Sequence, residues 1–251
     1  MIDFIGQKIS THVEAAIQRM VSAEHFRAGS LVSMPVLYPS GASVVIEVTL
    51  QQGRCFVSDR GGGHQEAEMM GVQRGYAKEA ERIAAESGIR FDGRDMFVAE
   101  VDIERLPGAM EVVANSSQLA VSLCALRASE RDARDARERL YDKLAEVYPT
   151  REIVRDAPVM GASSHRWKIA ALVKGSAGAS VFEAVTANYN SVVGAAAKFH
   201  DLARLDNSPR RIAVIDPKAG IGDFYGVIAP AASSVIEMTS PRAKFEELLA
   251  A

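Results

Sequence analysis

Forty consecutive residues, Ala109–Tyr148, contain neither proline nor glycine. Because these two residues most often end a helix, the stretch predicts one long helix or two abutting helices, closed by Pro149. Its second half, Arg127–Glu146, carries opposite charges three and four positions apart, which is typical of a solvated helix surface. A helix of this length divides the chain, and we place a domain boundary there, with one domain at 1–107 and a second at 108–251.

The composition is that of a soluble globular protein, with 48% hydrophobic and 24% charged residues. The 29 basic and 32 acidic residues give a net charge of -3, so no overall field attracts nucleic acid or an anionic membrane. Nucleic-acid binding would therefore need a local basic patch. No apolar run approaches the roughly 20 residues of a membrane span, and the N-terminus lacks a signal-peptide pattern. We expect a cytoplasmic protein with no membrane partner.

Residues that could ligate a metal are scattered along the chain. Cys55 and Cys124 lie far apart with no C-x-x-C motif, and the five histidines occur singly. Two ligands on one helix face would need a spacing such as H-x-x-x-H. We therefore expect two reduced core cysteines, no zinc site and no cofactor.

The residues before the long helix predict a small α+β domain. Apolar residues at helical spacing indicate an amphipathic opening helix from Ile2 to about His25. Three strand-like runs separated by turns then predict an antiparallel meander. These runs are Ser30–Tyr38, Ser43–Leu50 and Arg54–Ser58. A helical stretch over 65–87 that breaks near Gly71 or Gly75, and two short strands at 89–91 and 96–101, complete the domain.

A glycine cluster follows the third strand, with Asp59 before Gly61, Gly62 and Gly63. Successive N–H groups there could cradle an anion, but the P-loop's terminal Lys-Ser/Thr is missing, so a tight turn with positive φ is the favoured interpretation. The segment Val57-Ser58-Asp59-Arg60-Gly61-Gly62 resembles a family of uncharacterised prokaryotic proteins that is frequent in prophages and mobile elements. The resemblance spans about 26–71 and implies a phage, mobile-element or defence context, with no known activity.

After the long helix, the pattern predicts three strands, a helix and further strands. The strand candidates before the helix are Glu152–Met160, Arg166–Lys174 and Ser180–Thr186. Asn188 is a plausible N-cap for a helix to about Leu205. Buried strands at 211–215 and 234–238 precede a last helix from Pro241 to about Leu249. This order resembles the PD-(D/E)xK nuclease fold over roughly 127–251, which implies a restriction-endonuclease-like α/β domain.

The chemistry of that family needs a carboxylate on the second strand and a Glu-x-Lys triplet on the third, which together hold magnesium and activate water. Glu183 stands where the triplet's acid belongs, but Val185 replaces the lysine and the second strand has no carboxylate. The resemblance therefore implies a degraded active site. As an alternative, Lys198 on the following helix could replace the lysine and Asp156 could supply the second magnesium ligand. A third interpretation makes Glu183 a polar residue on a half-buried strand.

A nuclease core without catalysis can still bind nucleic acid or a partner protein. Seven basic residues suit phosphate contact: Arg166, Lys168, Lys174, Lys198, Arg204, Arg210 and Arg211. Scattered surface charge is the competing interpretation. We expect a non-catalytic protein that binds DNA or a phage or host protein. A magnesium-dependent nuclease and a structural oligomer are the alternatives, and a homodimer through the long charged helix stays open.

Overall fold

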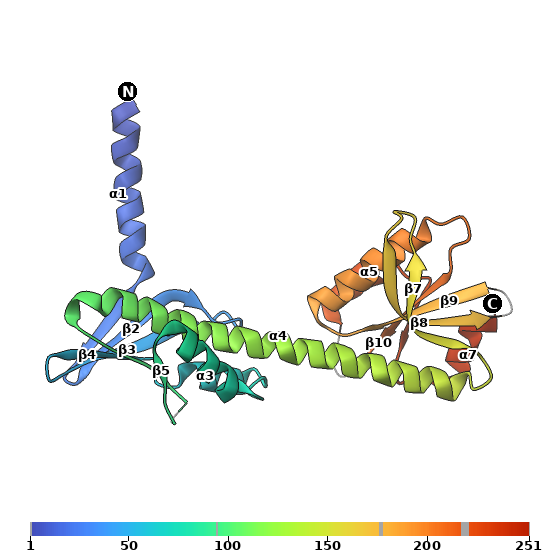
Figure 1. The fold of residues 1–251 in the computed structure, drawn as a ribbon. Helices are drawn as coiled ribbons and strands as arrows, with labels where there is room; N and C mark the ends of the chain where they lie inside the picture. The colour runs from blue at the N-terminus through green and yellow to red at the C-terminus, as the bar shows by residue number, and fades with distance from the viewer. Residues whose placement is uncertain (1, 94, 176–177, 217–220, 251) are drawn as a thin grey trace. The chain divides into compact units, whose positions relative to one another are not determined.

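The computed structural model describes residues 2–93, 95–175, 178–216 and 221–250. The chain forms two compact units, Met1–Ala128 and Ser129–Ala251, each built of helices and one sheet (Figure 1). This architecture confirms the α/β fold class. Asp216 follows the strand at 211–215, and residues 217–220 lie outside the described part of the chain.

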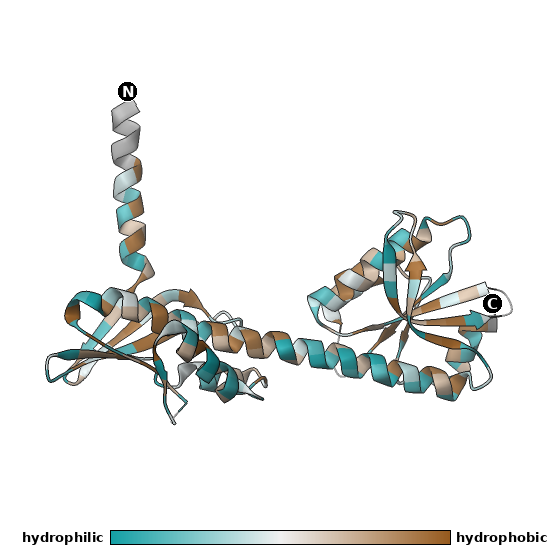
Figure 2. Ribbon diagram, in the orientation of Figure 1, coloured by the Kyte–Doolittle hydropathy of each residue, from teal (hydrophilic) through white to brown (hydrophobic). Residues whose placement is uncertain are grey.

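The long helix is a single element, α4, which runs Leu106–Val147. Its N-terminal half is largely apolar and its middle is polar (Figure 2). Val113, Ala114 and Val121 are fully buried in the core of the N-terminal unit. The two compact units divide inside α4, at 128/129 and not at the predicted 107/108, because the apolar half of the helix packs in the core of the N-terminal unit.

The N-terminal unit holds a six-stranded antiparallel sheet with the order β1-β2-β3-β4-β6-β5. The strands are β1 (Ser22–Phe26), β2 (Gly29–Leu37), β3 (Ser43–Gln51), β4 (Arg54–Ser58), β5 (Arg90–Phe91) and β6 (Phe97–Val101). The meander β2-β3-β4 confirms the prediction. The opening helix α1 (Ile2–Met20) is shorter than predicted, because residues 22–26 pair with β2 as an edge strand instead of continuing the helix.

Helices cover one face of this sheet. They are α2 (Gly62–Met69), α3 (Tyr76–Ser87) and the first half of α4. Alternate strand residues such as Ile46, Val57 and Phe97 are fully buried against these helices. Each such side chain contributes about 1.5–3 kcal/mol of transfer free energy. Both cysteines are buried and not joined in a disulfide, in agreement with the prediction of two core thiols.

The C-terminal unit holds a five-stranded mixed sheet with the order β11-β10-β9-β8-β7. Its elements are β7 (Ile153–Met160), β8 (Arg166–Gly175), β9 (Gly178–Val185), α5 (Tyr189–Ala203), β10 (Arg210–Ile215), α6 (Tyr225–Ile228), β11 (Ser234–Glu237) and α7 (Arg242–Ala250). The first three strands are antiparallel, and β10 and β11 run parallel to β9. The predicted order of helices and strands is confirmed, as is the N-cap: Asn188 accepts from the Asn190 amide.

Two apolar clusters lie in this unit. Leu140 and Leu144 of α4 pack with Phe182 of β9 in one cluster. Phe199 of α5 packs with Val181 of β9 in the other. Neighbouring residues of β9 thus join different cores, because successive strand side chains point to opposite faces of a sheet.

The region Ile103–Val147, which contains α4, includes an 18-residue window apolar enough to cross a membrane by length and composition. Protein covers 44% of that window. The core helix of a soluble protein passes the same test. The N-terminal half of α4 packs in the core of the N-terminal unit. The absence of a membrane partner and the cytoplasmic location stay predictions.

Asp201 of α5 ties down the turn between β7 and β8. Its carboxylate accepts from the Ser163 amide at 2.9 Å, the Ser163 hydroxyl at 2.6 Å and the Trp167 indole N–H at 2.7 Å. Gly161 lies so close that a Cβ there would overlap this carboxylate. The hydrogen bonds from Ser163 and Trp167 lower the pKa of Asp201 below its ordinary value.

We expect Asp201→Asn to destabilise the C-terminal unit most at neutral pH. A carboxyl with a lowered folded pKa stabilises the fold above its unfolded pKa of about 3.9, and this stabilisation is lost as pH falls through the folded value. The gap between variant and wild type should therefore shrink below about pH 4. Urea unfolding at several pH values, followed by the fluorescence of the single tryptophan, Trp167, measures this difference in the free energy of unfolding. Exposed Asp206→Asn is the control, and a pH-independent gap would contradict the prediction.

Candidate functional site

Glu183 sits where the pairing between β8 and β9 ends. The regular register runs from Gly175↔Gly178 to Ala171↔Phe182. At the next position, the Ala170 amide donates to Glu183 Oε1 at 3.1 Å instead of to a strand carbonyl. The Glu183 side chain is 6% exposed. The carboxylate therefore satisfies a backbone donor that the sheet leaves without a ladder partner.

Lys198 of α5 completes this arrangement. Its Nζ lies 2.8 Å from Glu183 Oε1 and also donates to the Lys168 carbonyl at 2.8 Å. The lysine side chain is 19% exposed, so the ion pair is largely removed from water. Glu183 and Lys198 thus replace ladder hydrogen bonds where β8 and β9 part. Glu183 and Lys198 are therefore in contact, as the nuclease alternative requires.

Asp156 contacts a different set of residues. It lies in β7 with a positive φ of 48°. Its carboxylate is 3.1 Å from Lys168 Nζ, 3.4 Å from an Arg137 nitrogen and 3.5 Å from the Tyr141 hydroxyl. Asp156 thus pairs with Lys168 and Arg137, whereas Glu183 pairs with Lys198.

Among the described residues, the two acids of the nuclease alternative contact cations and not each other. Magnesium takes oxygen ligands that converge on one point, whereas Glu183 and Asp156 each face a lysine. Within residues 2–93, 95–175, 178–216 and 221–250, no three His, Cys, Asp or Glu side chains are arranged to hold a metal ion. The ion pair between Lys168 and Asp156 joins β8 to β7, and the ion pair between Lys198 and Glu183 joins α5 to β9.

Five of the seven predicted phosphate-binding residues make intramolecular contacts. Lys168 pairs with Asp156, Lys174 pairs with Glu152 at 2.9 Å, and Lys198 pairs with Glu183. Arg211 donates to Ser208 and to the carbonyls of Pro209 and Ala231, and burial lowers the pKa of its guanidinium. The exposed residues Arg166 and Arg204 complete the predicted set.

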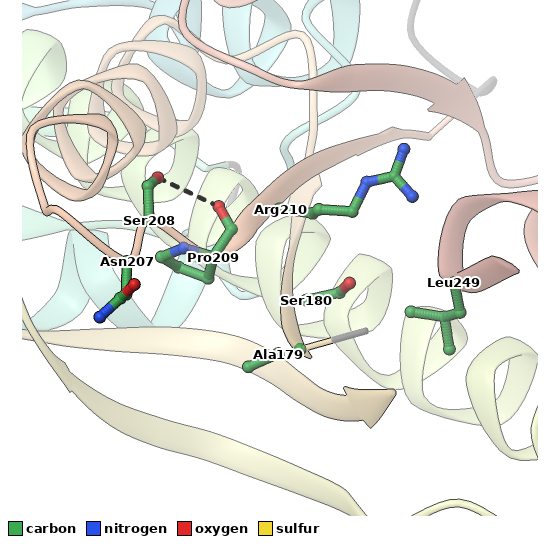
Figure 3. A pocket seen from close by; sticks show the side chains of 8 residues that line it. Ala179, Ser180, Asn207, Ser208, Pro209, Arg210 and Leu249 are labelled. Carbon is green, nitrogen blue, oxygen red and sulfur yellow. Dashed lines mark hydrogen bonds between the residues drawn. The ribbon is translucent and has the colours of Figure 1, made fainter. Parts of the chain in front are cut away.

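Arg210 lines a pocket of about 540 Å³ at the start of β9 and β10 (Figure 3). Ser180, Asn207, Ser208 and Leu249 are among the other lining residues. The Arg210 guanidinium donates to the Leu248 carbonyl at 2.7 Å and makes further contacts. Arg210 therefore ties the last helix to β10.

Sequence reasoning missed the ion pair between Arg139 of α4 and Asp216, which follows β10. Asp216 is buried, 5% exposed. Arg139 belongs to the charged stretch that the pattern assigns to a solvated surface. Three more of those charges also form ion pairs, namely Arg127 with Glu79, Arg137 with Asp156 and Glu138 with Arg155. Alternating charge alone carries no signal that separates such contacts from a water-facing surface.

The glycine loop of the N-terminal unit binds its own carboxylate. Asp59 accepts from the amides of Gly61 at 3.2 Å and Gly63 at 3.3 Å, and from Phe97 at 2.9 Å. Arg60 has a φ of 53° and Gly61 a φ of 75°. The loop is therefore a tight turn with positive φ, and its inward N–H groups hold Asp59 rather than an external anion.

A hydroxyl network extends from Asp59 into the core. Ser117 of α4 donates to Asp59 at 2.6 Å, and Tyr38 lies 2.8 Å from Ser117. Burial raises the pKa of Asp59, and the hydrogen bonds from Ser117 and the amides oppose this shift. Burial also raises the pKa of Tyr38 to about 12. The sequence signal for this network was weak: a Ser116-Ser117 pair within an apolar part of the helix.

Comparison with protein-family models, with curated proteins and with solved structures found no match.

Proposed function

We propose that the chain is a non-catalytic binding protein in which the nuclease-like C-terminal unit has a structural role at its former catalytic position. The contact between Glu183 and Lys198 carries this proposal. Both side chains are held by the backbone of β8 and by each other. A magnesium ion at Glu183 would have to bind beside the Lys198 ammonium, which already neutralises this carboxylate.

A protein is the partner that we propose, in preference to nucleic acid. Phosphate binding needs cations that can reach the ligand. Lys198 is largely covered beside Glu183, and the exposed Lys168 and Lys174 are each paired with a carboxylate. In addition, every residue from Ile9 to Met20 in α1 is exposed, including four large apolar side chains. The proposed phage, mobile-element or defence context comes from the resemblance of the glycine-loop segment alone.

The second candidate is the magnesium-dependent nuclease. One observation favours it: Lys198 lies beside Glu183, as a lysine moved to the following helix would. For activity, Asp156 would have to exchange Lys168 and Arg137 for a metal shared with Glu183. Such a change would break the ion pairs of Asp156.

A supercoiled plasmid incubated with the protein and magnesium chloride, then run on a native agarose gel, separates these functions. We expect neither a nicked product nor a shifted band. Nicking that disappears in Glu183→Ala would establish the nuclease, whereas nicking that persists in that variant would indicate a contaminant. A shift that weakens steeply with salt would establish nucleic-acid binding instead.

Light scattering addresses the structural-oligomer alternative. We expect a mass that does not depend on added DNA. A stable oligomer that is indifferent to DNA and salt would favour the structural alternative, and the same measurement tests for a homodimer.

A further inference from the structure

Glu66 of α2 is a buried acid without a counterion. It is 5% exposed. Among the residues that the structure describes, none makes a hydrogen bond or ion pair with its carboxylate, although neighbouring acids of the unit, such as Asp59 and Glu79, have several donors. Because Glu66 also lines a pocket, a cationic ligand that enters this pocket would be stabilised by its carboxylate.

Glu66 lines a pocket of about 420 Å³. One wall is a single face of α2, formed by Gly62, Gln65, Glu66 and Met69 at helical spacing. The strands and the glycine loop supply the remaining walls: Leu31, Tyr38, Ser43, Val45, Asp59 and Arg60. The pocket therefore combines apolar lining residues with a carboxylate that has no ion-pair partner in the described part of the chain.

We propose that this pocket binds an arginine or lysine side chain of a partner protein. The aliphatic stem of such a side chain would contact Leu31, Val45 and Met69, and its cationic end would pair with Glu66. The inference rests on the proposed function, because it names the kind of group that the partner presents.

The other charged side chains that line the pocket, Asp59 and Arg60, already have partners within the protein. The carboxylate of Asp59 accepts four internal hydrogen bonds. Arg60 is 57% exposed at its side chain and lies 3.9 Å from Glu47. A divalent metal would need several converging oxygen ligands, whereas Glu66 is the one lining carboxylate without donors. One organic cation is the ligand that this arrangement matches.

Amide NMR spectra of the full chain, titrated with two short peptides, test the proposal. One peptide is acetyl-Gly-Arg-Gly-amide and the other replaces arginine by the uncharged isostere citrulline. We expect the arginine peptide to shift the amides of Gly62 and Gln65 with a dissociation constant in the millimolar range. Glu66→Gln should weaken its binding about tenfold or more, because the amide keeps the shape and removes the charge.

Two further variants complete the test. Glu68→Gln, on the same helix but exposed and next to His64, should bind the arginine peptide like wild type. Met69→Lys changes an exposed lining residue three positions from Glu66, so its ammonium should occupy the pocket and abolish binding without harming the fold. Equal shifts with the citrulline peptide, or full binding by Glu66→Gln or Met69→Lys, would overturn the proposal.

Failure here is distinguishable from failure of the proposed function. Absence of peptide shifts in wild type would remove this pocket as a binding site and leave the plasmid result untouched. Nicking or a salt-sensitive shift of plasmid would instead contradict the non-catalytic protein-binding role, whatever the peptides do.

Discussion

Lys198→Met is expected to lower the free energy of unfolding of the C-terminal unit by about 3–5 kcal/mol. The substitution keeps most of the aliphatic stem and removes the ammonium. Glu183 then remains as a buried charge with no cation, and the Lys168 carbonyl loses its donor. Urea unfolding monitored by Trp167 fluorescence measures the change, because Trp167 lies on β8, next to Lys168.

A double variant separates the ion pair from simple loss of packing. Glu183→Gln combined with Lys198→Met removes both charges and keeps an oxygen that can accept from the Ala170 amide. We expect it to recover most of the lost stability. Lys174→Met, which breaks an exposed pair with Glu152, should cost about 1 kcal/mol or less. If Lys198→Met unfolds like wild type, the structural role proposed for the pair is wrong.

Asp59→Ala is expected to destabilise the N-terminal unit by about 3 kcal/mol or more. The change leaves the Ser117 hydroxyl and the amides of Gly61, Gly63 and Phe97 without their common acceptor. Hydrogen exchange of the Phe97 amide, followed by NMR, measures the effect where it arises. We expect exchange about a hundredfold faster or more.

The control for this substitution is Asp102→Ala. Asp102 is 60% exposed at its side chain and pairs with Arg54 on the surface. Its loss should change the exchange rate of Phe97 little, because exposed pairs contribute about 0–1 kcal/mol. Equal protection of Phe97 in Asp59→Ala and wild type would contradict the role of Asp59 as the centre of this network.

Local patterns predicted most of the elements. The alternation in Ser43–Gln51 and the gap in proline and glycine before Pro149 depend on residues close together in the chain, and both elements formed as expected. The edge strand Ser22–Phe26 was missed because it depends on pairing with β2. Without that partner, the segment continues the helical pattern of α1.

The candidate site was predicted less completely. Sequence reasoning named Glu183 and Lys198, since the nuclease-like order of elements puts one on a strand and the other on the next helix. It also grouped Asp156 with them, but the fold gives that residue partners on α4 and β8. Glu66 had no signal at all, because an acid in a short helix reveals its burial only when strands from elsewhere close around it.

The sequence by itself determined the order of helices and strands and the glycine turn after Asp59. These properties depend on backbone preferences and on periodicity over a few residues. Only the tertiary structure decided which charges are paired, that the two compact units divide inside α4, and that Glu66 has no counterion among the described residues. Those outcomes depend on burial and on contacts between distant segments, and the free energy of a charge changes with both.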